Sequence, residues 1–449
     1  MKNAILSQRD LAVLWHPCTQ MHDHETFPLI PIKSGEGVWL EDFEGNRYLD
    51  AISSWWVNLF GHANPIINAA LKNQLDNLEH VIFAGFTHEA AIELAEKLVA
   101  ITPAGLSRCF YADNGSAAVE VALKMSFHYW QNCGQSQKTK FITLENSYHG
   151  ETLGALAVGD VALYKKTYAP LLMDVMTVSS PDCYFREEGE SWADYSTRQF
   201  VHLEQTLQQH ANEVCAVIIE PLVQCAGNMR MYDAVYLKLL REACDKYGVH
   251  LITDEIAVGF GRTGTLFACE QAAISPDFLC LSKGLTGGYL PLSAVLTTDK
   301  IYGAFYDDYE KLSAFLHSHS YTGNALACRA ALATLSIFES QDVLANNSIL
   351  AAKMTVLAQR FLNHPNVAEV RQTGMIVAIE LVKNKTTRDP YPWQERRGLQ
   401  VYRYALSKGV LLRPLGTVIY FMPPYVITQD ELTVMFDVAW QAMVNVTTK

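Results

Sequence analysis

One stretch near the middle of the chain contains two apolar runs that each end in a charged residue. The run 249–253 is rich in β-branched residues and follows a turn glycine, which predicts a buried strand ending at Asp254 and Glu255. A second apolar run, 278–282, predicts another strand and ends at Lys283. Because open α/β sheets bind ligands beyond the carboxyl ends of their strands, we expect Asp254 and Lys283 to lie beside one ligand.

An acid and a lysine on two sides of a ligand suit one cofactor in particular. Pyridoxal phosphate needs a lysine to form its Schiff base and an acid to keep its pyridine nitrogen protonated. The alternative is that Asp254 and Lys283 are ordinary surface residues at strand ends. These two residues alone leave both interpretations open.

The order of the remaining runs predicts the fold class. From about residue 65 to residue 330, predicted helices (65–80, 88–100, 117–130, 231–247) alternate with predicted strands (108–112, 141–144, 216–220). This alternation is typical of an α/β fold with a mostly parallel sheet that is covered on both faces. Beyond it, helices at 325–339, 343–363 and 399–408 and short strands at 367–371, 375–382, 410–413 and 418–422 predict a smaller α+β domain.

Three parts of the chain follow from this pattern. Residues 1–60 are expected to be irregular apart from a hairpin of 37–41 with 47–50, and to pack with the small domain. Residues 61–330 form the predicted large, cofactor-binding domain. Residues 331–449 form the predicted small domain.

Composition excludes several classes of function. The formal net charge of −12 is unlike the basic footprint of a nucleic-acid-binding protein. Met1 to Trp15 contains no apolar core long enough for a signal peptide, and no uncharged apolar run in the sequence reaches the length of a membrane span. The ten cysteines are scattered without a Cys-x-x-Cys pair, which favours reduced thiols in the cytoplasm over disulfides or zinc, with Cys215, Cys244 and Cys280 in the core.

Two other motifs favour different chemistry but fit it poorly. Residues 259–264 match G-x-G-x-x-G and would suggest a dinucleotide-binding dehydrogenase. However, Asp254 and Glu255 separate the strand from these glycines, and 265–268 is a poor start for a helix. His317 and His319 could suggest a metal, but no ligands follow at the spacing of a metal site, so we predict no metal.

Further candidate residues depend on their surroundings. Asp113-Asn114-Gly115-Ser116 lies between a predicted strand and helix, an arrangement that points backbone N–H groups at a phosphate. Arg413 ends an apolar run and, beside a pocket, would bind a carboxylate through both arms of its guanidinium. Trp55 and Trp56 are expected to be core residues, or one of them walls a ligand pocket.

Together these pieces resemble a known family. Asp113–Ser116, Tyr148-His149-Gly150, Ile219-Glu220-Pro221, Thr253–Glu255, Gly259–Gly264, Lys283-Gly284 and Tyr321–Asn324 occur in this order. The set resembles the class III pyridoxal-phosphate aminotransferases of fold type I over nearly the whole chain.

The resemblance implies a role for each site residue. Lys283 would form the Schiff base, Asp254 would pair with the pyridinium nitrogen, and Tyr148 would stack on the ring. Catalysis would rest on these three residues. The other implied residues are Gly115 and Ser116 at the phosphate, His319 and Ser320 from the neighbouring subunit of a homodimer, and Trp55, Cys18, Ser318 and Arg413 at the substrate. Tyr148 and Lys283 would contact the substrate as well.

A second set of motifs resembles the branch of this class that acts in biotin biosynthesis. It comprises Trp15-His16-Pro17, Ser53–Trp56, Val223-Gln224, Arg413-Pro414 and Tyr420–Tyr425. This resemblance implies transamination of 7-keto-8-aminopelargonate, a small-molecule substrate whose carboxylate Arg413 would bind. A general ω-amino-acid aminotransferase would share every cofactor residue and is the alternative.

The amino donor stays open between S-adenosylmethionine and lysine. S-adenosylmethionine is the default of the branch, and its sulfonium and adenine favour aromatic contacts. Cys18 stands where a tyrosine is usual, Ser318-His319 where Gly-Pro is common, and Ser320 where a threonine is usual. These departures, with residues 305–310, resemble the members that use lysine.

Overall fold

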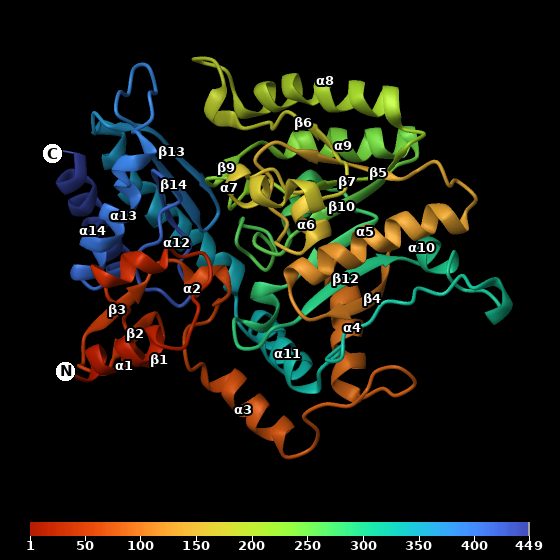
Figure 1. Ribbon diagram of the computed structural model, residues 1–449, viewed down its shortest axis with the longest axis horizontal. Coiled ribbons are helices and arrows are strands. Elements are labelled where there is room, and N and C mark those ends of the chain that lie inside the picture. Colours follow the sequence, from red (N-terminus) through yellow and green to blue (C-terminus); the bar gives the residue numbers. More distant parts are fainter. Residues whose placement is uncertain (448–449) are drawn as a thin grey trace.

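The central feature of the computed structural model, which describes residues 1–447, is a seven-stranded sheet (Figure 1). In spatial order its strands are β4 (Leu106–Ala112), β12 (Ser293–Thr298), β11 (Phe278–Leu281), β10 (His250–Asp254), β7 (Val214–Ile219), β5 (Lys140–Leu144) and β6 (Met176–Val178). From β11 to β6 all neighbours are parallel, whereas β12 is antiparallel to both β11 and β4. The predicted mostly parallel α/β sheet is therefore confirmed.

Alternate residues of the strands face two separate hydrophobic clusters, because successive side chains of a strand point to opposite faces. On β10, Leu251 belongs to one cluster and Ile252 to the other. The cluster of Ile252 contains Val121 and Ala122 of α5 (Gly115–Asn132). The cluster of Leu251 contains residues of α4 (Glu89–Ile101), α8 (Trp192–His210) and α9 (Ala234–Tyr247). Both faces of the sheet are thus covered by helices.

The remaining helices surround this core and form the C-terminal part. The α-helices are α1 (Lys2–Leu11), α2 (Ser53–Trp56), α3 (Pro65–Leu75), α4 (Glu89–Ile101), α6 (Leu153–Ala157), α7 (Ala162–Lys165), α8 (Trp192–His210), α9 (Ala234–Tyr247), α10 (Asp299–Gly303), α11 (Ala325–Ser340), α12 (Val343–Ala358), α13 (Arg397–Ser407) and α14 (Gln429–Thr447). The short 3₁₀ helices are η1 (Met21–Glu25), η2 (Lys166–Leu171), η3 (Cys183–Phe185), η4 (Ala268–Ala272), η5 (Lys283–Thr286), η6 (Tyr309–Lys311), η7 (Gln359–Asn363) and η8 (Trp393–Glu395).

Smaller sheets complete the fold, and the pairing of β3 (Arg47–Asp50) with β15 (Val410–Leu411) in one of them joins the N- and C-terminal parts of the chain. This sheet has the order β1 (Ile32–Glu36), β2 (Trp39–Asp42), β3 and β15. Another consists of β13 (Val367–Thr373), β14 (Ile376–Leu381) and β16 (Val418–Phe421), and a two-stranded one of β8 (Val223–Gln224) and β9 (Arg230–Met231). The N- and C-terminal elements lie side by side as a result (Figure 1).

Most predicted elements are present, with ends shifted by a few residues. The hairpin of β2 and β3 is confirmed, and the predicted helix 343–363 is α12 followed by η7. The expectation that the first residues are irregular was wrong, because Lys2–Leu11 is helical. The boundaries at residues 60 and 330 stay predictions, and the last two residues of the predicted small domain lie outside the described range.

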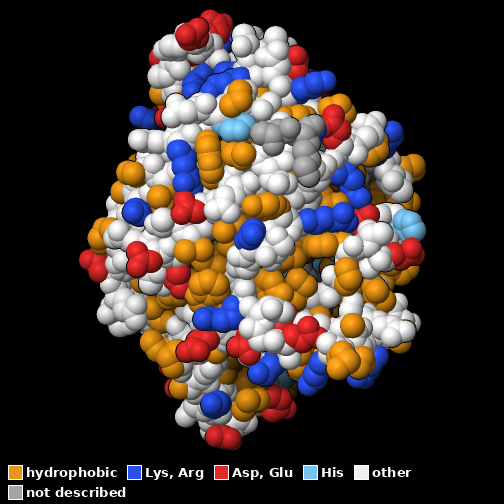
Figure 2. Space-filling model, turned by 90° about the vertical axis from the view of Figure 1, so that its left-hand side faces the viewer, with side chains coloured by type: hydrophobic (Ala, Val, Ile, Leu, Met, Phe, Trp, Pro, Cys, Tyr) orange, Lys and Arg blue, Asp and Glu red, His pale blue; other side chains and the backbone are white. Residues whose placement is uncertain are grey.

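The surface around the chain ends mixes charge and apolar groups. On the face that carries these elements, acidic and basic side chains are interspersed with hydrophobic ones (Figure 2). Among residues 1–447, no helix has the length and apolarity that a membrane crossing requires. The ten cysteines are free thiols, and Cys215, Cys244 and Cys280 are buried as predicted.

Candidate active site

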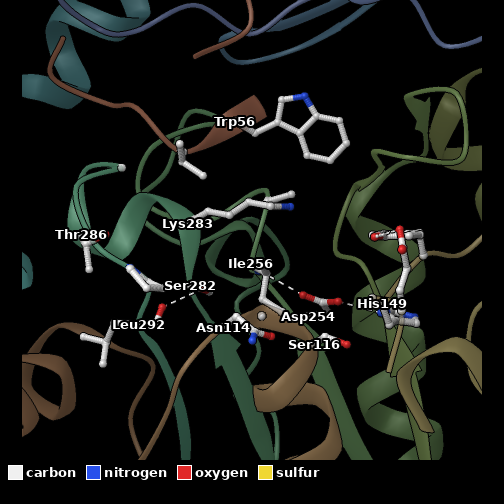
Figure 3. Close-up of a pocket in the computed structure, with 18 of the residues that line it drawn as sticks. Trp56, Asn114, Ser116, His149, Asp254, Ile256, Ser282, Lys283, Thr286 and Leu292 are labelled. Atoms are coloured by element: carbon white, nitrogen blue, oxygen red, sulfur yellow. Dashed lines mark hydrogen bonds and ion pairs between the residues drawn. The ribbon is translucent and has the colours of Figure 1, made fainter. Parts of the chain in front are cut away.

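A cavity of about 560 Å³ lies beyond the carboxyl ends of β10 and β11 (Figure 3). Its walls come from widely separated parts of the sequence. They include Trp56, Asn114, Gly115, Ser116, Tyr148, His149, Glu151, Glu220, Asp254, Ile256, Lys283, Thr286 and residues 288–292. The position expected for Asp254 and Lys283 is confirmed, since both line this one cavity.

Asp254 is fixed by hydrogen bonds at both of its oxygens. It is the last residue of β10, where the parallel partner on β11 is Cys280. Its Oδ2 accepts a hydrogen bond from His149 Nδ1 at 2.7 Å and its Oδ1 one from the amide of Ile256 at 3.1 Å (Figure 3). Only 4% of Asp254 is exposed, so these donors replace the water that a buried carboxylate would otherwise need.

Glu220 is a second buried acid of the cavity, directly after β7. It accepts hydrogen bonds from the backbone amides of Tyr148 and Cys225, both at 3.0 Å. Burial raises the pKa of Glu220 to about 7, against the opposing effect of His149. The residue thereby anchors the backbone that carries Tyr148. Glu255, by contrast, accepts from the amides of Ala268 and Cys269 and caps η4.

Lys283 begins η5 and extends beneath the ring of Trp56 (Figure 3). Its Nζ lies 4.6 Å from the centroid of the Trp56 ring. Burial lowers the pKa of Lys283, although Cys225, Asp254 and Glu220 act in the opposite direction. A lowered pKa increases the fraction of the neutral amine, which is the form that attacks a carbonyl or accepts a proton.

The start of α5 forms a cradle for an anion. Asn114 caps the helix by accepting from the amide of Ala117 at 3.0 Å. A Cβ at Gly115 would lie 2.8 Å from Ile256 Cγ2, so a glycine is needed for the close packing here. The Ser116 hydroxyl lies 2.7 Å from that of Thr152. Free N–H groups and the dipole at the start of a long helix favour a phosphate at this place.

These groups fit pyridoxal phosphate. The start of α5 at Gly115 and Ser116 suits its phosphate, and the buried carboxylate of Asp254 would suit its ring nitrogen. The amine of Lys283, which lines the same cavity, would suit its aldehyde. The donor set therefore matches the three polar ends of this cofactor.

The two adjacent tryptophans come from α2, which is a single left-handed turn and not a regular α-helix. Residues 53–56 all have positive φ angles, between 45° and 73°. For residues other than glycine this conformation costs on the order of 1 kcal/mol each. Trp56 is buried and donates from Nε1 to the Tyr420 hydroxyl at 3.0 Å, whereas Trp55 is 39% exposed. Trp56 thus walls the cavity, and the expectation that both are core residues was wrong for Trp55.

Four of the expected substrate residues lie close together beside the cavity. The guanidinium of Arg413 lies 4.5 Å from the centroid of the Trp55 ring and donates to the carbonyl of Cys18 at 3.2 Å. The Cys18 thiol is 3.9 Å from Glu151 Oε1, which also accepts from the Tyr148 hydroxyl at 3.0 Å. We refer to Cys18, Tyr148, Glu151 and Arg413, with Trp55, as the rim cluster.

Residues 318–320 lie away from these groups within the chain. None of them is among the described residues that line the cavity. His319 Nδ1 is 3.6 Å from Asp113 Oδ2, next to the phosphate cradle, and the carbonyl of Ser320 accepts from His80 Nε2. Their expected contact with a neighbouring subunit stays a prediction. Residues 1–447 contain no cluster of side chains that could hold a metal ion.

The glycine-rich segment 259–264 connects parts of the fold and is not a nucleotide-binding loop. Its Arg262 is buried and donates to the carbonyls of Pro423 at 2.7 Å and Asn58 at 3.1 Å. The next helical residues are those of η4, which starts at Ala268. The segment therefore ties the two ends of the chain to the central sheet, and the geometry gives no support to a dehydrogenase.

Sequence reasoning gave no role to His149, Glu220 and Glu151, and it left open which of the two tryptophans walls the pocket. His149 and Glu220 lay within the quoted motifs, and their position next to strand ends was an available signal. Glu151 gave no such signal, because its contact with Cys18 joins residues that are distant in the sequence.

Comparison with known proteins identifies the family. The family model of class-III aminotransferases matches residues 19–443. The chain belongs to the class-III aminotransferases. This family uses pyridoxal phosphate, and the cavity of this class-III aminotransferase has the donor set for it.

Several relatives are similar over nearly their full length. The adenosylmethionine-8-amino-7-oxononanoate aminotransferase of Helicobacter pylori is 51% identical over 433 residues, 95% of each chain. The crystal structure of the enzyme of that name from Methanocaldococcus jannaschii has a TM-score of 0.93 at 39% identity, covering 98% of this chain and 99% of that one. An omega transaminase from Pseudomonas jessenii in complex with PMP has a TM-score of 0.94 at 29% identity, covering 99% and 98%.

Proposed function

We propose that this class-III aminotransferase converts 7-keto-8-aminopelargonate (8-amino-7-oxononanoate) to 7,8-diaminopelargonate in biotin biosynthesis. The observation that carries the proposal is the rim cluster beside the Lys283 cavity, where Arg413 and Trp55 lie together. A cavity with aromatic walls and one arginine at its edge suits a long apolar acid. The names of the relatives at 37–51% identity support the same substrate.

Pyridoxal phosphate, when bound, supplies an aldehyde that takes up an amino group and a protonated ring that withdraws electrons from the neighbouring carbon. In this proposal Lys283 holds the cofactor and, once freed, moves the proton at the donor carbon with its Nζ. Its lowered pKa makes the neutral amine available for that transfer. The Trp56 ring, 4.6 Å from Nζ, keeps water from this face of the amine.

Asp254 and the start of α5 orient the cofactor. The Asp254 carboxylate, held by His149 at 2.7 Å, would keep the ring nitrogen protonated. Gly115 and Ser116 would bind the phosphate, and Tyr148 would contact the ring. Glu220 accepts a hydrogen bond from the Tyr148 amide and thereby fixes the position of the Tyr148 ring in the cavity.

The donor is a cationic amine. Glu151 presents a carboxylate beside the Tyr148 hydroxyl, which suits the ammonium of S-adenosylmethionine or of lysine. Cys18 lacks the aromatic face that would contact a sulfonium and adenine, and this favours lysine. The names of the relatives favour S-adenosylmethionine.

The acting form is a homodimer in this proposal. Leu316, Tyr309 and Tyr321 are 91%, 89% and 65% exposed, so the segment that contains them presents apolar groups on the surface of the single chain. Such a surface is typical of a protein interface. Ser318, His319 and Ser320 of the same segment would then reach the phosphate of the neighbouring subunit.

A half-reaction assay tests the proposal. Purified protein loaded with pyridoxal phosphate is mixed with S-adenosylmethionine or lysine, and the loss of the visible cofactor band is followed. The product is then mixed with 7-keto-8-aminopelargonate or with pyruvate, and 7,8-diaminopelargonate is measured by mass spectrometry. We expect turnover with the oxononanoate; transfer to pyruvate alone would indicate a general ω-amino-acid aminotransferase.

Two variants make the assay specific. Lys283→Ala should abolish both half-reactions, because it removes the proton-transferring amine. Arg413→Lys keeps the charge but loses the bidentate fork, so it should raise KM for the oxononanoate by about tenfold without changing cofactor loading. Equal KM values for the acid and its methyl ester would contradict the role of Arg413.

A further inference from the structure

Asp50 lies at the end of β3, directly before the left-handed turn 53–56, and is fully buried. Its Oδ1 accepts hydrogen bonds from the amides of Ile52 at 3.3 Å and Ser54 at 2.9 Å. Its Oδ2 accepts from the Ser54 hydroxyl at 2.7 Å and contacts His62 Nε2 at 3.1 Å. One carboxylate thus binds the backbone and the side chain of a residue in the strained turn.

His62 holds this carboxylate from the other side. The side-chain oxygen of Asn58 accepts from the amide of Gly61 at 2.7 Å, so the Asn58 amide nitrogen is the donor to His62 Nδ1 at 3.3 Å. His62 therefore carries its proton on Nε2 and donates it to Asp50. The hydrogen bonds from Asn58 to His62 and from His62 to Asp50 hold the Asp50 carboxylate in one orientation.

The register of two strands brings the turn to Arg413. β3 and β15 pair in parallel, with Leu411 opposite Asp50, and the amide of Ala51 donates to the carbonyl of Leu411. The segments that follow β3 and β15 therefore start next to each other. The first leads to Trp55 and the second leads to Arg413. Within the turn the two rings contact different groups, because Trp55 lies against Arg413 and Trp56 lies over Lys283.

We propose that Asp50 is a positioning residue for the keto-acid substrate, which sets the left-handed turn and thereby the place of Trp55 against Arg413. The proposal rests on the function proposed above, in which Arg413 binds the substrate carboxylate. Asp50 itself does not line the cavity formed by the described residues, and it acts through Ser54. A strained, over-determined backbone beside a binding residue is the pattern expected when the strain serves that residue.

The alternative is that Asp50 merely stabilises its sheet, and Asp42 is a matched control for that role. Asp42 is also buried in this sheet, and it accepts from the amides of Glu44 and Asn46 and from the Tyr48 hydroxyl. It caps the turn between β2 and β3, which is not part of the cavity or the rim cluster. Asp42→Asn should therefore lower stability without changing the site.

The experiment measures binding of nonanoate, a carboxylate of the substrate's chain length, to the cofactor-loaded protein by titration calorimetry. Asp50→Asn leaves the Ser54 hydroxyl or His62 without an acceptor, and we expect the Kd of nonanoate to rise about tenfold. The KM for the oxononanoate should rise with it. Asp42→Asn should bind nonanoate as the unmodified protein does. Near-UV circular dichroism reports the environment of the tryptophans in each variant.

A second substitution provides a rescue. Ser54 has a φ of 45°, which a glycine adopts without steric cost, so Ser54→Gly in the Asp50→Asn background should recover part of the nonanoate affinity. If Asp50→Asn fails to fold, Ser54→Ala removes one hydrogen bond to Asp50 and should weaken binding in the same direction.

The outcomes separate this inference from the proposed function. Unchanged nonanoate affinity in folded Asp50→Asn or Ser54→Ala would overturn the positioning role, as would an equal loss in Asp42→Asn. If the unmodified protein neither binds nonanoate nor converts the oxononanoate, the role of Arg413 and the positioning role fail together.

Discussion

At the scale of single residues, the site depends on buried carboxylates held in different ways. Asp254 accepts hydrogen bonds from a histidine and a backbone amide, whereas Glu220 accepts hydrogen bonds from two backbone amides. Burial disfavours the charged form of an acid, and donors oppose that effect. For Glu220 burial dominates and raises its pKa to about 7. This acid therefore titrates near neutral pH inside the site.

The raised pKa of Glu220 predicts how folding stability changes with pH. Between about pH 4.5 and about pH 7 the folded protein keeps a proton on Glu220 that the unfolded chain has lost. The contribution of this residue to the free energy of unfolding is therefore full below about pH 4.5 and falls as pH rises to about 7, by at most about 3 kcal/mol.

The measurement compares urea unfolding of the unmodified protein and Glu220→Gln across this pH range. Glu255, whose pKa burial also raises to about 7, is common to both proteins, so the difference between the two curves isolates Glu220. The unmodified protein should lose more stability than the variant as pH rises. Parallel curves would mean that Glu220 does not titrate in this range.

At the scale of elements, the start of α5 decides how tightly the phosphate is held. Gly115→Ala places a Cβ about 2.8 Å from Ile256 Cγ2, so the first turn of the helix has to shift. We expect the Kd of pyridoxal phosphate to rise by about tenfold, because anion binding depends on the positions of the first N–H groups.

Gly303 of α10 provides the control for this prediction. A Cβ at Gly303 meets no atom within 4 Å, and its φ is not in the left-handed region. Gly303→Ala should leave cofactor affinity unchanged in a fluorescence titration with pyridoxal phosphate. Equal affinities for the Gly115→Ala and unmodified proteins would place the phosphate elsewhere.

At the scale of the whole molecule, buried ion pairs connect the C-terminal sheet to the central part. Arg371 of β13 contacts Glu380 at 2.9 Å and donates to the carbonyls of Met229 and Asn228 at 2.7 and 2.6 Å. Arg230 of β9 binds the same Glu380 at 3.2 Å. Arg371 is 2% exposed, so these contacts are shielded from water and salt.

Removing Arg371 should therefore be costly. Arg371→Met leaves Glu380 and two carbonyls short of donors, and we expect a loss of about 3–5 kcal/mol in the free energy of unfolding, measured with urea. Lys97→Met removes the exposed pair of Lys97 with Glu339 and should cost less than about 1 kcal/mol. A loss at Arg371 no larger than at Lys97 would show that the buried network does not hold the two parts together.

The sequence by itself predicted many of the elements and the meeting of Asp254 and Lys283 at one cavity. Strand-forming runs that end at Asp254 and Lys283 are local patterns, and neighbouring parallel strands bring their carboxyl ends to one edge. The phosphate cradle is local as well, since Asn114, Gly115 and Ser116 are consecutive. For these residues the chemistry could be predicted from strand ends, turns and motif order.

Only the tertiary structure decided the substrate end. Arg413 meets Trp55 and Cys18 because β15 pairs with β3, a contact between residues more than half the chain apart. The left-handed turn at 53–56 was also not predictable, because its sequence has no glycine to permit positive φ. Ser53 donates to the carbonyl of Met422 and Trp56 to the hydroxyl of Tyr420, and hydrogen bonds between such distant residues cannot be read from the local sequence.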